Sequence, residues 1–166
     1  MKHTNDTLLR SVASRLKQIR IERGLTQEVV TDRTKVNVGL YEVGTTNITI
    51  VLLTVLCNFY NVTLEEFFKG IEYEKAWRFI FLWKSDDLKP TNPILVDLIA
   101  RRLTEIREQH NHTKEYVMHN THLSISHYEN ELKFPSLESI AKFCKFYNIS
   151  LEKFFAGITY PEEPQE

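Results

Sequence analysis

The sequence predicts an all-α protein built from two copies of one small helical module. The first observation is an internal repeat: residues 8–71 match residues 95–158 at a fixed offset of 87 positions, with about 22 of 64 positions identical and no gap. The second is the spacing of apolar residues by three and four along several segments, and the third is a set of helix-capping residues between those segments. Together they favour five short helices in each copy.

The repeat also sets the domain boundaries that we expect. Residues 1–71 form the first module, residues 72–92 a connector, residues 93–160 the second module and residues 161–166 a tail. Each module is small for an independent core, but 42% of the chain is hydrophobic, which is enough to fill two compact units. The first residues lack the apolar segment of a secretory signal and no apolar run is long enough to span a membrane, so we expect a cytoplasmic protein.

The first helix of each module is marked by an apolar stripe and a terminating residue. In the first copy the stripe predicts a helix over residues 8–23 that ends at Gly24, and in the second copy Pro93 suits the first turn and Asn111 replaces Gly24. The stripes consist of Leu8, Val12, Leu16 and Ile19, and of Leu95, Ile99, Leu103 and Ile106.

Two shorter helices follow in each copy. Thr26 and Thr113 are suited to cap a helix of about eight residues, and Asn37 and Ser124 are suited to cap a very short third helix that ends at a glutamate. The stretches TTNIT and ELKFPS come next and are loop-like by composition, and Thr49 and Ser136 are the following candidate caps.

Two closing helices complete each module. Residues 50–60 are nearly all apolar and by themselves suit a strand or a helix, but the equivalent residues 137–147 place lysines opposite an apolar stripe, which favours a helix in both copies. Thr63 and Glu66 have the spacing of a capping box that opens the last helix. That helix carries two adjacent phenylalanines in each copy, Phe67–Phe68 and Phe154–Phe155.

The connector has an unusual composition because it holds both tryptophans of the chain. Its aromatic residues suit either additional cover for the first core or an interface, between the modules or in a homodimer. We favour a helix over residues 73–84, although a strand also fits this stretch. The candidate interface residues are Tyr73, Trp77, Phe81 and Trp83.

Charge and residue usage narrow the possible functions. The net charge is −1, with eleven Lys and Arg against nine Asp and Glu up to Trp83 and ten against thirteen afterwards, so the first module is the better electrostatic partner for nucleic acid. Cys57 and Cys144 are equivalent positions in apolar segments, which indicates buried thiols in two separate cores and no disulfide. We expect no enzyme, no cofactor and no metal, because phosphate loops and nucleophile motifs are absent and the cluster of histidines around His119 lacks partners at ligand spacing.

The order of these elements resembles the helix-turn-helix domain of the phage-repressor (Cro and C1, or XRE) family. The motifs that carry the resemblance occur twice and cover roughly 130 of 166 residues. In the first copy they are Arg15-Leu16-x-x-Ile19-Arg20, Gly24-Leu25-Thr26-Gln27-Glu28, Glu42 and Val62-Thr63-Leu64-Glu65-Glu66-Phe67-Phe68. In the second they are Arg102-Leu103-x-x-Ile106-Arg107, Thr113-Lys114-Glu115, Glu129, Pro135-Ser136-Leu137-Glu138 and Ile149-Ser150-Leu151-Glu152.

The resemblance implies a transcriptional regulator that binds double-stranded DNA with the third helix in the major groove and the start of the second helix on phosphates. It also implies two structural ion pairs, Arg20 with Glu42 and Arg107 with Glu129. Gln27 is the position best matched to DNA contact, and Lys114 takes its place as a phosphate contact. The DNA-contact candidates are Gln27, Arg33, Lys35, Asn37, Lys114, Asn120, His122, Ser124, Ser126 and His127.

One departure from the family pattern leaves a second function open. Only fifteen positions separate Gln27 from Glu42, and fifteen separate Lys114 from Glu129, which is about three fewer than most family members have and nearly one helical turn. The third helices are therefore short and poor in the side chains that read bases. The alternative is a protein-interaction module on the same fold, with weak or no sequence-specific DNA binding.

Overall fold

The computed structural model describes residues 6–71 and 93–158, and these residues form an all-helical structure with no β-strand. No helix in this part of the chain has the length and apolar character needed to cross a membrane. The ten helices are α1 (Asp6–Glu22), α2 (Gln27–Thr34), α3 (Val38–Glu42), α4 (Ile50–Phe59), α5 (Leu64–Phe68), α6 (Pro93–Gln109), α7 (Lys114–Thr121), α8 (Ile125–Glu129), α9 (Leu137–Phe146) and α10 (Leu151–Phe155). The connector, with its expected helix over residues 73–84 and its aromatic residues, lies outside the described residues.

Helices α1–α5 correspond one to one with α6–α10. Each helix of the first set begins and ends 87 positions before its counterpart, so the offset of the sequence repeat is also the offset of the secondary structure. The turns correspond as well. Gly24 and Asn111, which end the first helix of each set, both have the left-handed backbone conformation, with φ of 65° and 54°.

Capping explains why most of these helices begin where they do. The hydroxyls of Thr26 and Thr113 accept hydrogen bonds from the third residue beyond them, and Thr63 and Glu66 form the expected capping box. One expected cap is wrong in detail. Ser124 occupies the N-cap position of α8, but its side chain makes no capping hydrogen bond, whereas Asn37 caps α3 by accepting from the backbone N–H of Leu40.

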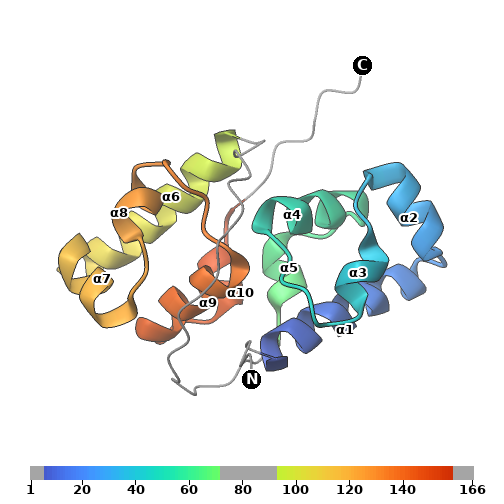
Figure 1. Ribbon diagram of the computed structural model, residues 1–166, viewed down its shortest axis with the longest axis horizontal. Helices are drawn as coiled ribbons and strands as arrows, with labels where there is room; N and C mark the ends of the chain where they lie inside the picture. Colours follow the sequence, from blue (N-terminus) through green and yellow to red (C-terminus); the bar gives the residue numbers. More distant parts are fainter. Residues whose placement is uncertain (1–5, 72–92, 159–166) are drawn as a thin grey trace.

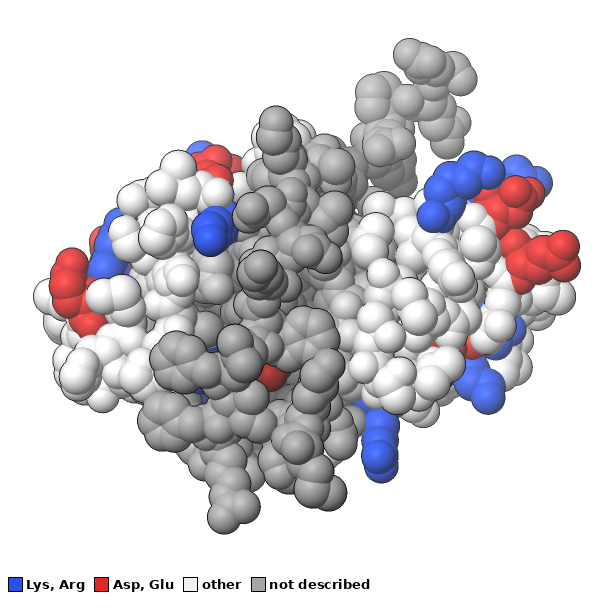
Figure 2. Space-filling view, in the orientation of Figure 1, with Lys and Arg blue, Asp and Glu red and all other residues white. Residues whose placement is uncertain are grey.

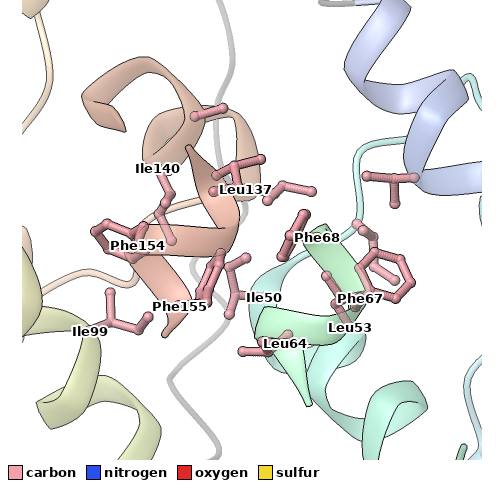
Figure 3. Packing of buried hydrophobic residues seen from close by; sticks show 14 of the residues in the cluster. Ile50, Leu53, Leu64, Phe67, Phe68, Ile99, Leu137, Ile140, Phe154 and Phe155 are labelled. Atoms are coloured by element: carbon pink, nitrogen blue, oxygen red, sulfur yellow. The ribbon is translucent and has the colours of Figure 1, made fainter. Parts of the chain in front are cut away.

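The core is one continuous cluster, which corrects the expectation of two separate cores. Buried apolar residues from α1, α4 and α5 and from α6, α9 and α10 belong to the same cluster. The junction is at α5 and α10, where the rings of Phe68 and Phe155 stack with centroids 4.9 Å apart and planes 13° from parallel. Figure 3 shows these two rings between Ile50 and Leu137, which are themselves equivalent positions. Cys57 and Cys144 are buried free thiols.

A second contact across the junction joins equivalent backbone positions. Thr49 and Ser136, the N-caps of α4 and α9, form an isolated antiparallel bridge. Contacts between residues that occupy the same place in each repeat are the mark of a two-fold interface. Figure 1 shows the two sets side by side, with α2 and α7 at opposite ends.

Candidate nucleic-acid interface

A buried ion pair joins the first helix to the third in the first repeat. Nε of Arg20 donates to Oε1 of Glu42 at 2.7 Å, and Nη2 donates to Oε2 at 2.8 Å, so the pair is bidentate. The third guanidinium nitrogen donates to the carbonyl of Leu25 at 2.8 Å. The Glu42 side chain is only 3% exposed. This pair holds α3 against α1 and against the loop before α2.

Gln27 is attached to the same carboxylate. Its Nε2 donates to Oε2 of Glu42 at 2.7 Å, which fixes the side-chain amide over the middle of α3. Gly39 leaves the space that this requires, because a Cβ at this position would lie 3.1 Å from Oε1 of Gln27. The first residue of α2 therefore presents its amide next to α3, and its carbonyl oxygen points toward Gly39.

The second repeat has the equivalent Arg–Glu pair, but a lysine stands beside the carboxylate where the first repeat has a glutamine. Nε and Nη2 of Arg107 donate to the two oxygens of Glu129 at 2.7 and 2.9 Å, and Nη1 donates to the carbonyl of His112 at 2.8 Å. Lys114 occupies the place of Gln27, with Nζ 3.5 Å from Oε2 of Glu129 and 3.3 Å from Oδ1 of Asn130. Lys114 is therefore held inward by a carboxylate and only partly offers its charge to a ligand.

The ion pairs shift the pKa values of their members. Burial would raise the pKa of Glu42, but hydrogen bonds from Arg20 and Gln27 outweigh it, and the pKa lies below its ordinary value. The hydrogen bonds that Arg20 donates to Glu42 raise the pKa of Arg20, and those that Arg107 donates to Glu129 raise the pKa of Arg107. The Arg20–Glu42 pair is thus fully charged at neutral pH.

The remaining first-repeat candidates surround the turn between α2 and α3. Lys35 ends α2 in the left-handed conformation, with φ of 58°, and its backbone N–H donates to the carbonyl of Thr31. Its ammonium lies 3.4 Å from Asp32 in an exposed ion pair. Arg33 and Asn37 are exposed, and the Asn37 side chain is occupied in capping α3.

The second-repeat candidates fall at the equivalent turn. His122 ends α7 in the left-handed conformation and donates its backbone N–H to the carbonyl of Met118. Asn120 is exposed but directs its amide to the carbonyl of Tyr116 at 2.8 Å. Ser126 and His127 are exposed on α8, and Ser124 is half-buried at its start.

Two exposed apolar residues lie on or directly after α3 and were not among the expected site residues. Leu40 on α3 is 48% exposed, and Val43, directly after α3, is 68% exposed. A signal for Leu40 was present in the sequence: its equivalent is His127, and an exchange of an aliphatic for a polar residue indicates a surface position. We use the name reading face for the exposed residues of α3 and α8 together with Gln27 and Lys114.

The charge on this side of the molecule is mixed. In Figure 1, α3 lies in front of α1 and α8 lies in front of α6, so both short helices are on the side turned toward the viewer. Figure 2, in the same orientation, shows mostly uncharged described surface there, with acidic and basic residues interspersed near the outer ends. No basic stripe crosses the described residues on this side.

A cluster of histidine and aromatic rings flanks the second half of the reading face. Nδ1 of His112 lies 3.3 Å from the hydroxyl of Tyr147, and the ring of His112 is 4.3 Å from that of Tyr116. In the first repeat the equivalents of His112 and Tyr116 are Leu25 and Val29. No group of three or more His, Cys, Asp or Glu side chains within residues 6–71 and 93–158 is arranged to hold a metal ion.

A scan against protein-family models finds no match to the chain, and searches of curated proteins and of solved structures find no significant match. The case for a function therefore depends on the residues and geometry described above.

Proposed function

We propose that the chain is a DNA-binding transcriptional regulator composed of two tandem helix-turn-helix domains of the phage-repressor type. In this proposal α2–α3 and α7–α8 are the two helix-turn-helix units, and residues 72–92 connect the domains. The support consists of the repeated motifs, the helix order and the two buried Arg–Glu pairs that fasten each third helix.

The observation that carries the proposal is the two-fold relation between the halves. The stacked Phe68 and Phe155 and the bridge between Thr49 and Ser136 join equivalent positions, and α3 and α8 are turned to the same side. Dimeric repressors place two such helices on one face of DNA, about 34 Å apart, to contact two half-sites one helical turn apart. A single chain here presents the pair that other proteins obtain by dimerisation.

Charged and polar residues on the reading face and at the neighbouring end of α2 suit phosphate contacts that orient the protein. The proposed phosphate ligands of the first domain are Gln27, Arg33 and Lys35, and Lys114 has this role in the second. Lys35 and Lys114 already have carboxylate partners, so few cationic side chains are left to bind phosphates. We therefore expect a shallow dependence of affinity on salt, with a slope corresponding to about two to four phosphate contacts.

A second candidate is favoured by a specific observation, the exposure of apolar side chains in and next to the second and third helices of each repeat. Leu40 and Val43 in the first repeat and Met118 and Leu132 in the second are about half exposed or more. Apolar residues within a polar surround are typical of a protein-docking surface. In this alternative the shortened third helices contact a protein and not DNA.

Selection of bound sequences from a random duplex pool distinguishes the two candidates. The full chain is incubated with the pool at low salt, bound duplexes are sequenced, and the affinity of the enriched duplex is measured against salt concentration. Enrichment of a two-part site about one helical turn in centre spacing supports the proposal. Absence of binding to any duplex at low salt would refute it and leave the protein-docking candidate.

Matched variants then test the reading face. We expect Gln27→Ala and Lys114→Ala each to weaken DNA binding, because each removes a proposed phosphate contact. The controls are Gln18→Ala on α1 and Lys153→Ala on α10, which remove the same side-chain types from exposed positions outside the reading face. Equal affinities for all four variants would exclude Gln27 and Lys114 from the interface.

A further inference from the structure

We propose that the two domains read chemically unlike half-sites: α3 reads thymine 5-methyl groups through Leu40, and α8 reads purine hydrogen-bonding edges through His127 and Ser126. This inference rests on the proposed DNA-binding function and adds the class of base that each domain recognises. Its consequence is an operator with two half-sites that have opposite orientations, as in a palindrome, but different base sequences.

The exposed chemistry of α3 is apolar. Val38 is buried, Gly39 has no side chain, and Glu42 is enclosed by its ion pair, which leaves Leu40 as the most exposed side chain of the helix. Val43 extends the same apolar character one residue beyond α3. In the major groove the feature that an aliphatic side chain can recognise is the methyl group of thymine.

Two side-chain amides among the described residues lie beside α3: Asn37 caps the helix, and the orientation of Gln27 supports an apolar readout. Its NH₂ group uses one of its two N–H donors on Glu42 at 2.7 Å, and its Oε1 lies over Gly39, so the amide is held against α3 with one N–H left for a phosphate. Bidentate recognition of adenine by Gln requires both the donor and the acceptor of the amide. Gln27 therefore contributes positioning to the first domain, and Leu40 contributes the base preference.

The exposed chemistry of α8 is polar at the equivalent positions. Ile125 is buried, whereas Ser126 and His127 are exposed and stand where the first repeat has Gly39 and Leu40. A hydroxyl and an imidazole both donate and accept hydrogen bonds. The acceptors N7 and O6 of guanine and N7 of adenine are the purine atoms that such donors meet in the major groove.

The arrangement of the domains turns this difference into a property of the operator. Because contacts between the halves join equivalent positions, and because Leu40 on α3 is the equivalent of His127 on α8, the two residues would approach the two half-sites in equivalent ways. A homodimer with identical heads selects a palindrome. This chain selects a thymine-rich half-site at α3 and a purine-reading half-site at α8.

The experiment uses the full chain and the duplex obtained by random selection, with single base analogues introduced at each position. Replacing thymine by deoxyuridine removes only the 5-methyl group, and replacing a purine by its 7-deaza analogue removes only the N7 acceptor. We expect deoxyuridine in one half-site to weaken binding about fourfold, the loss of one buried methyl contact. We expect 7-deazapurine in the other half-site to weaken binding about fivefold, the loss of one hydrogen bond.

Variants assign each effect to its residue. Leu40→Ala should abolish the deoxyuridine effect and leave the 7-deazapurine effect, and His127→Ala should do the reverse. Ile21→Ala, which shortens an aliphatic side chain that is 56% exposed on α1, should leave both effects intact. The double exchange Gly39→Ser with Leu40→His should shift the selected site toward two like halves. Circular dichroism melting of each variant shows whether the fold is retained.

The outcomes separate this inference from the function on which it rests. No binding to any duplex at low salt overturns the proposed function itself. Tight binding that is insensitive to both analogues, or a selected site with two identical halves, overturns the unlike-half inference while the DNA-binding function stands. A methyl effect that persists in Leu40→Ala overturns the assignment to Leu40.

Discussion

The two repeats place the same ion pair in different surroundings. In the first, the carboxylate of Glu42 receives the neutral amide of Gln27, and in the second the carboxylate of Glu129 lies beside the cationic Lys114. The Arg–Glu geometry is nearly the same in both, with all four distances between 2.7 and 2.9 Å. The comparison teaches that the Arg–Glu pair holds the third helix in the same way whether the first residue of the second helix is glutamine or lysine. Function can therefore diverge at Gln27 and Lys114 without loss of architecture.

The largest expected effects test whether the two halves share one core. Phe68→Ala and Phe155→Ala each remove a fully buried ring from the stacked pair, and we expect each to lower the free energy of unfolding by about 3–5 kcal/mol. The two-fold relation predicts similar losses, measured by urea denaturation of the full chain. A loss below about 1 kcal/mol at either position would show that the rings do not pack together in solution.

The next effect distinguishes the ion pairs. Arg20→Ala leaves Glu42 buried with only a neutral hydrogen-bond partner from Gln27, whereas Arg107→Ala leaves Glu129 with the ammonium of Lys114 3.5 Å away. We expect Arg20→Ala to cost about 3–5 kcal/mol of unfolding free energy and Arg107→Ala to cost less. Glu42→Ala should also lower the melting temperature well beyond a surface substitution. The double variant Arg107→Ala with Lys114→Ala should lose as much unfolding free energy as Arg20→Ala. Equal losses for the two single Arg variants would contradict this account.

A smaller effect with opposite signs is expected at two equivalent tyrosines. The hydroxyl of Tyr147 has His112 as its hydrogen-bond partner. The equivalent hydroxyl, that of Tyr60, is buried and has no hydrogen-bond partner among the described residues, because Leu25 stands at the position of the histidine. Tyr147→Phe should cost about 0.5–1.5 kcal/mol, and Tyr60→Phe should be neutral or stabilising. Leu25→His should then stabilise the protein only when Tyr60 is present. Thermal denaturation of the four variants measures this, and a clear loss in Tyr60→Phe would show that its hydroxyl is paired.

The smallest effect concerns acid stability. The folded-state pKa of Glu42 lies below its ordinary value of 4.5, so its contribution to stability is present above that pH and is lost as the pH falls through the folded-state pKa. The unfolding free energy of the wild type should therefore decline below about pH 4.5 more steeply than that of Glu42→Gln. Urea denaturation from pH 7 down to pH 3 measures both slopes, and parallel curves would exclude Glu42 as a source of acid sensitivity.

Much of the fold was predictable because its signals are local. The repeat, the apolar stripes and the capping residues predicted helices in both copies. Helices with a capping residue begin where expected, such as Gln27 after Thr26 and Leu64 after Thr63, whereas α1 begins at Asp6, two residues before the expected start. The shared core was not predicted, since Phe68 and Phe155 have the same apolar pattern whether they face their own module or the other one. Only the three-dimensional arrangement shows that they meet.

The candidate site was predicted less completely, for a physical reason. Residue type indicates which side chains can donate or accept hydrogen bonds, but not which of them are already occupied. Gln27, Lys114 and Asn120 had the chemistry of DNA ligands in the sequence, and the structure directs part of each toward protein atoms. Leu40 had no such chemistry, and the only sequence signal for its exposure was indirect, the presence of His127 at the equivalent position of the second repeat.

The bridge between Thr49 and Ser136 has a consequence for how the two halves can vary. In a homodimer, a substitution on one subunit appears on both, so a change that suits one half of the binding site is imposed on the other. Here the paired positions are encoded separately, and the local concentration of one half around the other does not fall when the protein is dilute. The two repeats can therefore stay paired at nanomolar protein concentration, and each repeat can acquire mutations independently of the other.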